Sequence, residues 1–370
     1  MALISFARGV PAPECLPVEE LADCARAAVE RDGHTVLSYG PGGGYGPLRE
    51  WIAARHGIEP GRVVLTSGSL QGFVFLAQHL LAGRGGRVLV EGPTYDRPLK
   101  ILRGLGAEIV TLPLDDDGLD PDVLARELAA GPAALLYTIP TFQNPSGRSL
   151  SLERRRRVVE LAREHGLLVL EDDPYGLVRF EGDELPSLYE LEGGERVAYS
   201  SSFSKTIAPG VRVGYFVLPA ELASAIEALA VSTYITPPFL PQATVYEIVR
   251  RGNFGPNLER VRGLLRVRRD AMLAALEREL PDGAVWSRPA GGYFVWLDLP
   301  PGLRTGDLQE HAAEVEVTFV KGADFFPVGS GAGEHSLRLA YSFVSPEEIA
   351  EGIARLARLV TGVTAHAAAM

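Results

Sequence analysis

The feature that most constrains the fold of this chain is a regular alternation of short apolar runs with helix-length segments, which begins near residue 62. The runs are almost continuously apolar, as is typical of strands that are buried on both faces. Seven such runs are present, at Arg62–Thr66, Arg87–Glu91, Glu108–Leu112, Ala133–Thr138, Leu167–Glu171, Arg196–Ser200 and Val213–Leu218. Segments of mixed polarity separate most of them, at Leu70–Leu81, Asp120–Ala130 and Leu152–His165. This alternation predicts an α/β fold, in which helices cover both faces of a mostly parallel sheet.

The connection between the last two runs differs from the others. Parallel neighbours need a long crossover, usually a helix, and Ser201–Arg212 is too short to supply one. This segment contains hydroxyl side chains, one lysine, a Pro209-Gly210 break and one arginine. We therefore expect an irregular connection, with one of the two strands antiparallel to the rest.

The pattern changes near residue 255, where we expect a smaller α+β domain to begin. Long helices are predicted over Ala220–Val231 and Leu258–Leu280. In the final helix, apolar residues recur at helical spacing from Ile349 to Val363 and mark a buried face. The elements expected after residue 280 are strands at Ala284–Arg288, Tyr293–Asp298, Val317–Val320 and Ser336–Tyr341, and helices at Thr305–Val315 and Pro346–Val363.

Charge and cysteine content exclude several classes of function. The formal net charge of −11 disfavours nucleic acid and anionic membranes as partners. No run of about 18 apolar residues is present, so no membrane span is expected. Arg8, Pro11 and Pro13 interrupt any secretory signal near the N-terminus. Cys15 and Cys24 are too few for a disulfide framework and lack metal-ligand spacing, which predicts a cytoplasmic protein without a metal site.

Residues that suit ligand binding follow the predicted strands, at the edge where open α/β sheets bind their ligands. In isolation, the Ser-Gly turn is also an ordinary helix cap, the Asn-Pro turn an ordinary turn, and the lysine an ordinary surface residue. The groups are Ser67-Gly68-Ser69-Leu70 after the first run, Tyr95 after the second, Asn144 after the fourth, Asp172 and Tyr175 after the fifth, and Ser202, Ser204, Lys205 and Arg212 after the sixth.

Together these groups describe one kind of ligand. A Gly/Ser turn that opens a helix binds phosphate through free backbone N–H groups. An aromatic face, an amide, a carboxylate and a phenol suit a flat polar ring, and a lysine can form a Schiff base. A phosphate, a flat ring and a Schiff-base lysine predict pyridoxal 5′-phosphate (PLP) as the cofactor.

The motifs resemble those of fold type I PLP-dependent aminotransferases of class I/II. The resemblance rests first on Asp172-x-x-Tyr175, followed by Ser202-x-Ser204-Lys205 and Arg212. It extends through nearly the whole chain and is closest to the 2-aminoadipate/kynurenine aminotransferase-like branch. The sequence motifs that indicate the branch are Ile4-Ser5-Phe6-Ala7, Thr66-Ser67-Gly68-Ser69, Phe142-Gln143-Asn144-Pro145-Ser146-Gly147, Glu171-Asp172-Asp173, Gly291-Gly292-Tyr293-Phe294-Val295-Trp296 and Leu337-Arg338-Leu339.

The resemblance implies a domain arrangement. Residues 31–255 would form a large PLP-binding domain with a mostly parallel seven-stranded sheet between helices. Residues 256–370 would form the small C-terminal domain. Residues 1–30 would be an N-terminal segment that packs on the small domain and on the mouth of the active site.

The resemblance also implies roles around the cofactor ring. Lys205 would form the Schiff base and then carry the proton of the substrate Cα. Asp172 would face the pyridine nitrogen and keep it protonated, which makes the ring an electron sink. Tyr175 and Asn144 would hydrogen-bond the phenolate oxygen of the ring, and Tyr95 would stack on it.

The resemblance also implies which residues bind the phosphate of the cofactor. The phosphate would lie on the backbone N–H groups of Ser69 and Leu70, with Ser202, Ser204 and Arg212 around it. Leu70 departs from the branch pattern, which usually has Gln there, so only the backbone contribution is kept.

Four residues are expected to contact the substrate or a second subunit. Arg338 would bind the substrate α-carboxylate as a bidentate pair, and Asn144 would contribute beside it. Tyr39 would reach the phosphate of the neighbouring subunit, which implies a homodimer with shared active sites. Arg8 stands where relatives usually carry Gly. We hypothesise that it binds a distal acid or phosphate of the substrate; the alternative is a solvated N-terminal arginine.

The leading functional prediction is therefore an aminotransferase. It would move an amino group between an L-amino acid and a 2-oxo acid by a ping-pong mechanism through a Lys205 Schiff base. The alternative is another PLP-dependent carbanion reaction, such as racemisation, or elimination or replacement at the β or γ carbon, because the same lysine, aspartate and tyrosine serve all of these. A PLP-bound sensor without turnover is a third possibility, but it requires a partner domain that we do not find in the sequence.

Overall fold

The computed structural model describes residues 2–369 and is built around one eight-stranded sheet. Its strand order is β2-β9-β8-β7-β6-β3-β4-β5. The strands are β2 (Val63–Thr66), β3 (Gly86–Gly92), β4 (Ala107–Asp115), β5 (Gly118–Leu119), β6 (Leu135–Thr138), β7 (Val169–Asp172), β8 (Val197–Ser202) and β9 (Gly214–Val217). The seven strands predicted from the apolar runs are confirmed to within a few residues. The eighth, β5, has only two residues and pairs antiparallel with the end of β4, so no apolar run marks it.

The predicted antiparallel strand is also confirmed. Strands β3, β4, β6, β7 and β8 pair in parallel. Strand β9 runs antiparallel to both of its neighbours, β2 and β8. The loop between β8 and β9 holds Lys205 and a single 3₁₀ turn, Pro209–Val211. The short connection therefore reverses the chain at the carboxyl end of β8, where a ligand can reach it.

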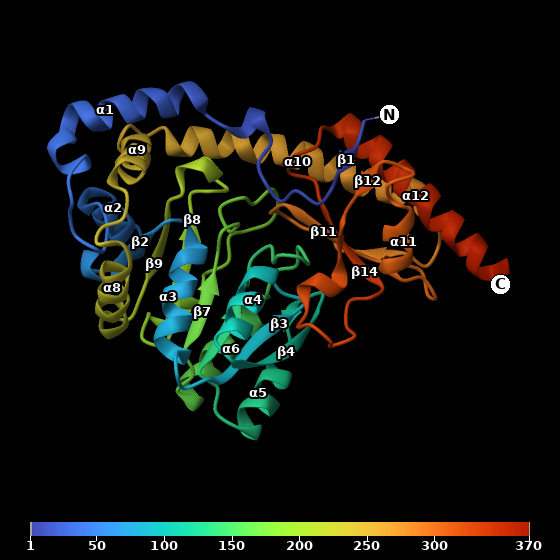
Figure 1. Ribbon diagram of the computed structural model, residues 1–370, viewed down its shortest axis with the longest axis horizontal. Helices are drawn as coiled ribbons and strands as arrows, with labels where there is room; N and C mark the ends of the chain where they lie inside the picture. The colour runs from blue at the N-terminus through green and yellow to red at the C-terminus, as the bar shows by residue number, and fades with distance from the viewer. Residues whose placement is uncertain (1, 370) are drawn as a thin grey trace.

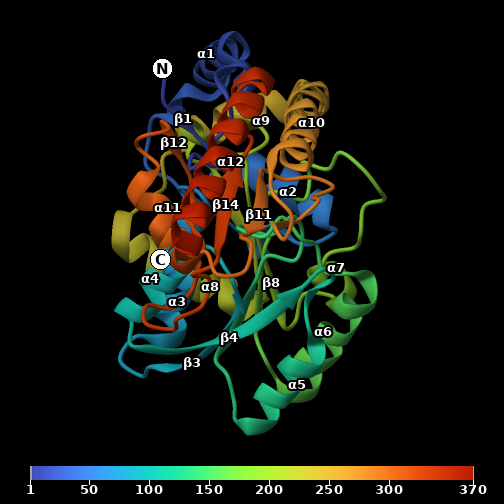
Figure 2. The ribbon, with the colours of Figure 1, turned by 90° about the vertical axis from the view of Figure 1, so that its right-hand side faces the viewer.

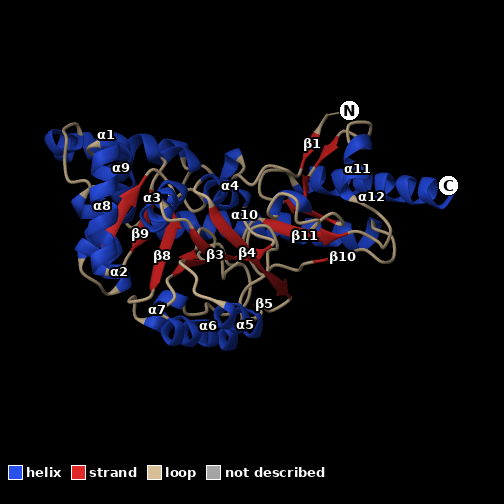
Figure 3. Ribbon diagram, turned by 60° about the horizontal axis from the view of Figure 1, so that its bottom comes forward, coloured by secondary structure: helices blue, strands red, loops and turns tan. Residues whose placement is uncertain are grey.

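Successive residues of the strands divide between two cores, as expected for a sheet that is covered on both faces. Val63 and Leu65 of β2 pack in one core, beneath α2 (Gly46–His56), α5 (Pro121–Ala130), α6 (Leu152–His165), α7 (Leu188–Glu192) and α9 (Phe239–Arg250). Val64, between them, packs in the other core, beneath α3 (Ser69–Leu81), α4 (Asp96–Gly104) and α8 (Ala220–Tyr234). Figure 3 shows α5, α6 and α7 together on one side of the strands.

The helices of this part follow the predictions only partly. The expected helices at Leu70–Leu81, Asp120–Ala130, Leu152–His165 and Ala220–Val231 are present, whereas α2, α4, α7 and α9 were not expected. The helices are α1 (Val18–Val36), α2 (Gly46–His56), α3 (Ser69–Leu81), α4 (Asp96–Gly104), α5 (Pro121–Ala130), α6 (Leu152–His165), α7 (Leu188–Glu192), α8 (Ala220–Tyr234), α9 (Phe239–Arg250) and α10 (Phe254–Glu279).

A second, antiparallel sheet forms in the C-terminal part, with the order β10-β11-β14-β13. Helices α10 and α12 pack on it, and Figure 2 shows α12 in front of β11 and β14. The elements are β10 (Val285–Trp286), β11 (Phe294–Asp298), α11 (Thr305–His311), β12 (Val317–Thr318), β13 (Val320–Lys321), β14 (Ser336–Ala340) and α12 (Pro346–Ala369).

The N-terminal strand β1 (Ile4–Ser5) pairs in parallel with β12. Ile4 and Phe6 are buried in the core of the C-terminal part. Helix α10 runs from the large sheet to the small one, as Figure 1 shows. The domain boundary at residue 255 stays a prediction. Among the described helices, none combines the length and the apolar character that crossing a membrane requires.

Candidate active site

The carboxyl ends of β6, β7 and β8 and the N-terminus of α3 surround a cavity of about 430 Å³. The C-terminal part closes it with Phe294 and Arg338. The structure thus brings most of the predicted site residues together, from segments that are far apart in the sequence. The predicted residues that line the cavity are Ser69, Leu70, Tyr95, Asn144, Asp172, Tyr175, Ser202, Ser204, Lys205, Arg212 and Arg338.

Lys205 projects into the cavity from the loop after β8. Its Nζ donates a hydrogen bond to the backbone carbonyl of Gly9 at 2.9 Å. The hydroxyl of Tyr293 donates to the Lys205 carbonyl oxygen at 3.2 Å, which fixes the backbone of the loop. Burial, together with the nearby Arg338 and Arg212, lowers the pKa of the Lys205 amine to about 8. A large fraction of the amine is therefore neutral and nucleophilic near pH 8.

Asp172 is the last residue of β7, and its two carboxylate oxygens differ in their hydrogen bonding. Its Oδ2 accepts a hydrogen bond from the hydroxyl of Tyr137 at 2.8 Å. Its Oδ1 is buried and accepts no geometrically defined hydrogen bond from any residue that the structure describes. Burial raises the pKa of Asp172 to about 6, and the hydroxyls of Tyr137 and, to a smaller extent, Ser200 oppose this shift. A buried acceptor without a partner is costly, so Oδ1 is suited to receive a donor from a ligand.

The N-terminus of α3 forms a cradle that depends on two glycines. Gly68 has a φ of +82°, and a Cβ there would lie 2.4 Å from a guanidinium nitrogen of Arg212. A Cβ on Gly214 would lie 2.4 Å from the backbone nitrogen of Ser69. Only glycine fits at either position, so the backbone N–H groups of the helix start stay open to the cavity. Such N–H groups bind phosphate.

Hydroxyls and one guanidinium complete this cradle. The hydroxyls of Ser202 and Ser204 hydrogen-bond each other at 2.8 Å. Arg212 has left-handed backbone angles (φ +50°), and its guanidinium donates to the carbonyl oxygens of Ser67 and Pro209 at 2.9 and 3.2 Å. These contacts hold the cation at the start of α3. Hydroxyls, a guanidinium and open backbone N–H groups together suit an anion.

Arg338 is buried on β14 between two aromatic rings. Its guanidinium carbon lies 4.2 Å from the ring centre of Phe294 and 4.9 Å from that of Phe325. It donates to Asn144 Oδ1 at 2.9 Å and to the Ala7 carbonyl at 3.0 Å, while its buried Nε has no partner in the described part of the chain. Burial lowers the pKa of Arg338 to about 10. A rigid, incompletely paired guanidinium of this kind is suited to a carboxylate.

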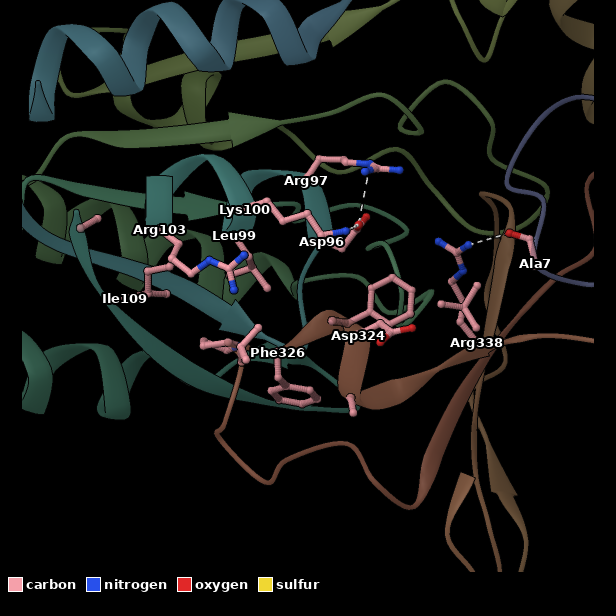
Figure 4. A pocket seen from close by; sticks show the side chains of 16 residues that line it. Ala7, Asp96, Arg97, Leu99, Lys100, Arg103, Ile109, Asp324, Phe326 and Arg338 are labelled. Carbon is pink, nitrogen blue, oxygen red and sulfur yellow. Dashed lines mark hydrogen bonds and ion pairs between the residues drawn. The ribbon is translucent and has the colours of Figure 1, made fainter. Parts of the chain in front are cut away.

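A second cavity of about 670 Å³ adjoins the first, between α4 and the loop that follows β13 (Figure 4). Asp96, Arg97 and Arg338 line both cavities. Figure 4 shows the side chains of Arg97, Lys100 and Arg103 extending from α4, opposite Phe326 and Asp324. This cavity was not predicted from the sequence, because helix α4, which lines it, was not expected.

Tyr39 and Arg8 lie elsewhere. Tyr39 is 82% exposed, in the loop between α1 and α2. The guanidinium of Arg8 lies 4.9 Å from the ring centre of Phe343, and among the described residues Arg8 lines neither cavity. Their predicted roles in binding stay predictions. Sequence reasoning also missed Gly9 and Tyr137, since a glycine near the N-terminus and a tyrosine inside a strand carry no functional signal.

The residues present fit PLP. The free Oδ1 of Asp172 suits a protonated ring nitrogen, the cradle at α3 suits a phosphate, and Lys205 offers an amine between them. Tyr95 and Tyr175 supply an aromatic face and a phenol in the same cavity.

The comparisons with known proteins agree with this site. The family model for aminotransferase class I and II matches residues 10–356. The chain is 39% identical to the 2-aminoadipate transaminase of Thermus thermophilus over 98% of this chain and 91% of the relative. A crystal structure of the α-aminoadipate aminotransferase of that organism, in complex with N-(5′-phosphopyridoxyl)-L-leucine, has a TM-score of 0.93 over 98% of this chain and 93% of the other. The crystal structure of the kynurenine aminotransferase of Pyrococcus horikoshii also has a TM-score of 0.93. It is 33% identical in sequence and covers 98% of this chain and 92% of its own.

Proposed function

We propose residue roles for this site on the premise that the chain belongs to the class I and II aminotransferases. It is a PLP-dependent enzyme that moves an amino group between an amino acid and a 2-oxo acid. The named relatives are aminotransferases, which favours transamination over racemisation or over elimination and replacement at the β or γ carbon. The observation that supports the roles best is the meeting of Lys205, Asp172 and Arg338 in one cavity.

Bound PLP supplies an electron sink for the negative charge that remains when the substrate Cα loses its proton. Lys205 holds the cofactor covalently and, once released, takes this proton on its Nζ. Its lowered pKa, about 8, leaves a large fraction of the amine neutral and able to accept a proton near pH 8. Asp172 binds the ring nitrogen through Oδ1. Arg338 orients the substrate through its α-carboxylate, with Asn144 beside it.

The remaining residues anchor the cofactor. The backbone N–H groups of Ser69 and Leu70, the hydroxyls of Ser202 and Ser204, and Arg212 hold the phosphate. Tyr95 stacks on the ring, and the hydroxyl of Tyr175 binds its phenolate oxygen.

Release of one oxo acid without an acceptor tests this assignment. Loaded protein mixed with L-glutamate alone should release about one 2-oxoglutarate per chain, because a ping-pong enzyme stops after half a cycle. The Lys205→Ala variant should release none on the same timescale. No oxo acid from any amino donor would contradict transamination, and equal release by the variant would contradict the role of Lys205.

For the substrate, we infer a preference for amino acids with an acidic side chain. The second cavity is lined by four cations, Arg97, Lys100, Arg103 and Arg338, and by two carboxylates, Asp96 and Asp324. This positive excess stands out in a chain of net charge −11. Arg97 lines both cavities, so it can meet the distal carboxylate of a substrate whose α-carboxylate lies on Arg338. Similarity to a 2-aminoadipate transaminase supports the inference.

The Arg97→Ala variant tests the preference. The KM for 2-aminoadipate should rise about tenfold, as expected for the loss of one hydrogen bond to a charged group, while the KM for L-leucine should not change. Arg126→Ala, which removes an exposed arginine from α5, is the matched control. An equal rise for both substrates would contradict a role in side-chain selection.

Arg8 can be tested on the same substrates. If it binds a distal acid, Arg8→Ala will raise the KM of acidic substrates and of no others. Unchanged constants for all acidic substrates would leave Arg8 as a solvated residue that contacts Phe343.

We also infer a homodimer. Leu37, Tyr39, Ile235 and Leu240 are large exposed hydrophobic residues. They belong to neighbouring segments, because a Cβ on Gly40 would meet the ring of Phe239 at the start of α9. Exposed apolar patches of this kind mark interfaces. A second copy that covers the patch would bring Tyr39 to the phosphate of its partner.

Light scattering should give the mass of two chains, and Tyr39→Phe should weaken PLP retention without dissociating the dimer. A monomer that retains PLP fully would contradict shared active sites.

A cytoplasmic location is our last inference. Cys15 and Cys24 are buried free thiols, as is typical of a reducing compartment. Fractionation of the source cells should recover the enzyme with cytoplasmic markers, and recovery from the secreted fraction alone would contradict this.

A further inference from the structure

Tyr137 is a buried residue of β6 that lies behind the active site. Its side chain is fully buried, and among the described residues it is absent from the lining of the cofactor cavity. Its hydroxyl nevertheless reaches the site, since it donates to Asp172 Oδ2 at 2.8 Å. Tyr137 thus touches the carboxylate that faces the cofactor without touching the cavity itself.

The sheet register explains this contact. Tyr137 lies opposite Leu170 in the parallel pair β6–β7. Because side chains alternate along a strand, Leu170 and Asp172 point to the same face as Tyr137. The ring of Tyr137 packs edge-on against Phe73, with ring centres 5.2 Å apart. The phenol therefore has one fixed direction, along the sheet toward the end of β7.

The hydrogen bond has two consequences for Asp172. First, a carboxylate held at one oxygen loses the freedom to rotate, so Oδ1 stays directed at the ligand. Second, the bond stabilises the ionised carboxylate in a buried setting that also contains Asp173 and Glu91, both of which raise the pKa of Asp172. An ionised Asp172 is the form that keeps a ring nitrogen protonated.

We propose that Tyr137 is a positioning residue for the cofactor: it occupies Oδ2 of Asp172 and so presents Oδ1, ionised, to the pyridine nitrogen of PLP. The proposal rests on the proposed role of Asp172. Tyr137 contacts neither cofactor nor substrate, and it acts only through this carboxylate.

The chain offers a matched control on the next strands. Tyr199 of β8 is also buried, and its hydroxyl donates to Asp173 Oδ2 at 2.9 Å. Tyr137→Phe and Tyr199→Phe each remove one hydroxyl and one hydrogen bond to an aspartate. Only the first of these aspartates lines the cofactor cavity.

Both variants and Asp172→Asn are loaded with PLP that carries ¹⁵N in the ring. The ¹⁵N chemical shift then reports the protonation of the ring nitrogen directly. We expect Tyr137→Phe to move the shift toward that of the neutral ring, as Asp172→Asn does, and to weaken PLP binding about tenfold. This is the loss expected for one hydrogen bond to a charged group. Tyr199→Phe should retain the wild-type shift and affinity.

A double variant separates positioning from general structural damage. If Tyr137 acts through Asp172, adding Tyr137→Phe to Asp172→Asn causes no further loss of PLP affinity. Additive losses, or a Tyr137→Phe shift equal to that of wild type, would overturn the proposal. If instead Asp172→Asn leaves the shift unchanged, the proposed role of Asp172 fails, and the proposal fails with it for that separate reason.

Discussion

Asp172 and Asp173 are neighbours in the sequence, yet they form two different sites on opposite faces of the sheet. Each accepts a hydrogen bond from a buried tyrosine, Tyr137 or Tyr199. Asp173 also uses its second oxygen, which accepts from the backbone nitrogen of Gly176 at 2.7 Å. The second oxygen of Asp172 accepts no hydrogen bond from the residues described in the structure. Burial raises the pKa of both, so the free oxygen, rather than burial, distinguishes Asp172, for which we propose a role in cofactor binding, from Asp173.

The largest expected effect is a difference in kcat between variants of these two aspartates. Asp172→Asn should lower kcat about a thousandfold, in the range seen when one preorganised electrostatic group is removed. Asp173→Asn should leave kcat within about tenfold of wild type, since it disturbs only buried hydrogen bonds. Steady-state kinetics at saturating PLP measures both. Equal losses of kcat in the two variants would contradict different roles for Asp172 and Asp173.

The next effect concerns Lys205, which lines the same cavity as Asp172. In protein stripped of PLP, the pKa of Lys205 is lowered to about 8 by burial and by Arg338 and Arg212. The rate of covalent PLP attachment should therefore rise about tenfold per pH unit between pH 6 and 8, and level off above. Stopped-flow absorbance measures this rate.

Arg338→Ala sharpens this prediction. It removes one of the cations that lower the pKa of Lys205, so the plateau should move to higher pH. A rate that does not depend on pH between 6 and 8 would contradict a lysine that titrates in this range.

A smaller effect is expected on the Asp173 face, from Glu171. Burial raises the pKa of this carboxyl from an ordinary 4.5 to about 7. A raised pKa means that the folded state binds the proton more tightly, so stability is lost as pH rises from 5 to 8. The loss amounts to about 2 kcal/mol. Glu171→Gln should remove this part of the pH dependence in urea unfolding, and kcat should change little. If the free energy of unfolding depends on pH identically in the wild type and in Glu171→Gln, the raised pKa of Glu171 is contradicted.

The smallest effect is that of Tyr199→Phe. It should lower the free energy of unfolding by about 1 kcal/mol, the usual size of one buried hydrogen bond. Urea unfolding at constant PLP saturation measures the change. A loss of catalysis without a loss of stability would show that the Asp173 face takes part in the reaction.

Residues at strand ends and residues inside strands differ in how well the sequence predicts their roles. Asp172, Tyr175 and Lys205 follow apolar runs, and the rule that ligands bind at strand ends places them together. Tyr137 lies inside such a run and looks like any core residue. The role that we propose for it follows from its register with β7, which no sequence pattern specifies.

Other misses have similar causes. Helix α4, which carries Arg97, was not expected because Pro98 lies in its first turn, where proline is tolerated but masks the helical pattern. Helix α9 likewise contains Pro241 near its start. Arg338 was assigned through family resemblance, since spacing alone cannot bring a residue of the small sheet to a cavity of the large one.

A crystal structure of the PLP-loaded protein tests the central claim most directly. It should show the ring nitrogen about 2.8 Å from Oδ1 of Asp172, an ordinary length for a charge-assisted hydrogen bond, with the Tyr137 hydroxyl still on Oδ2 and Lys205 Nζ bonded to the cofactor. A ring nitrogen that contacts another group, or a cofactor that is not joined to Lys205, would contradict it.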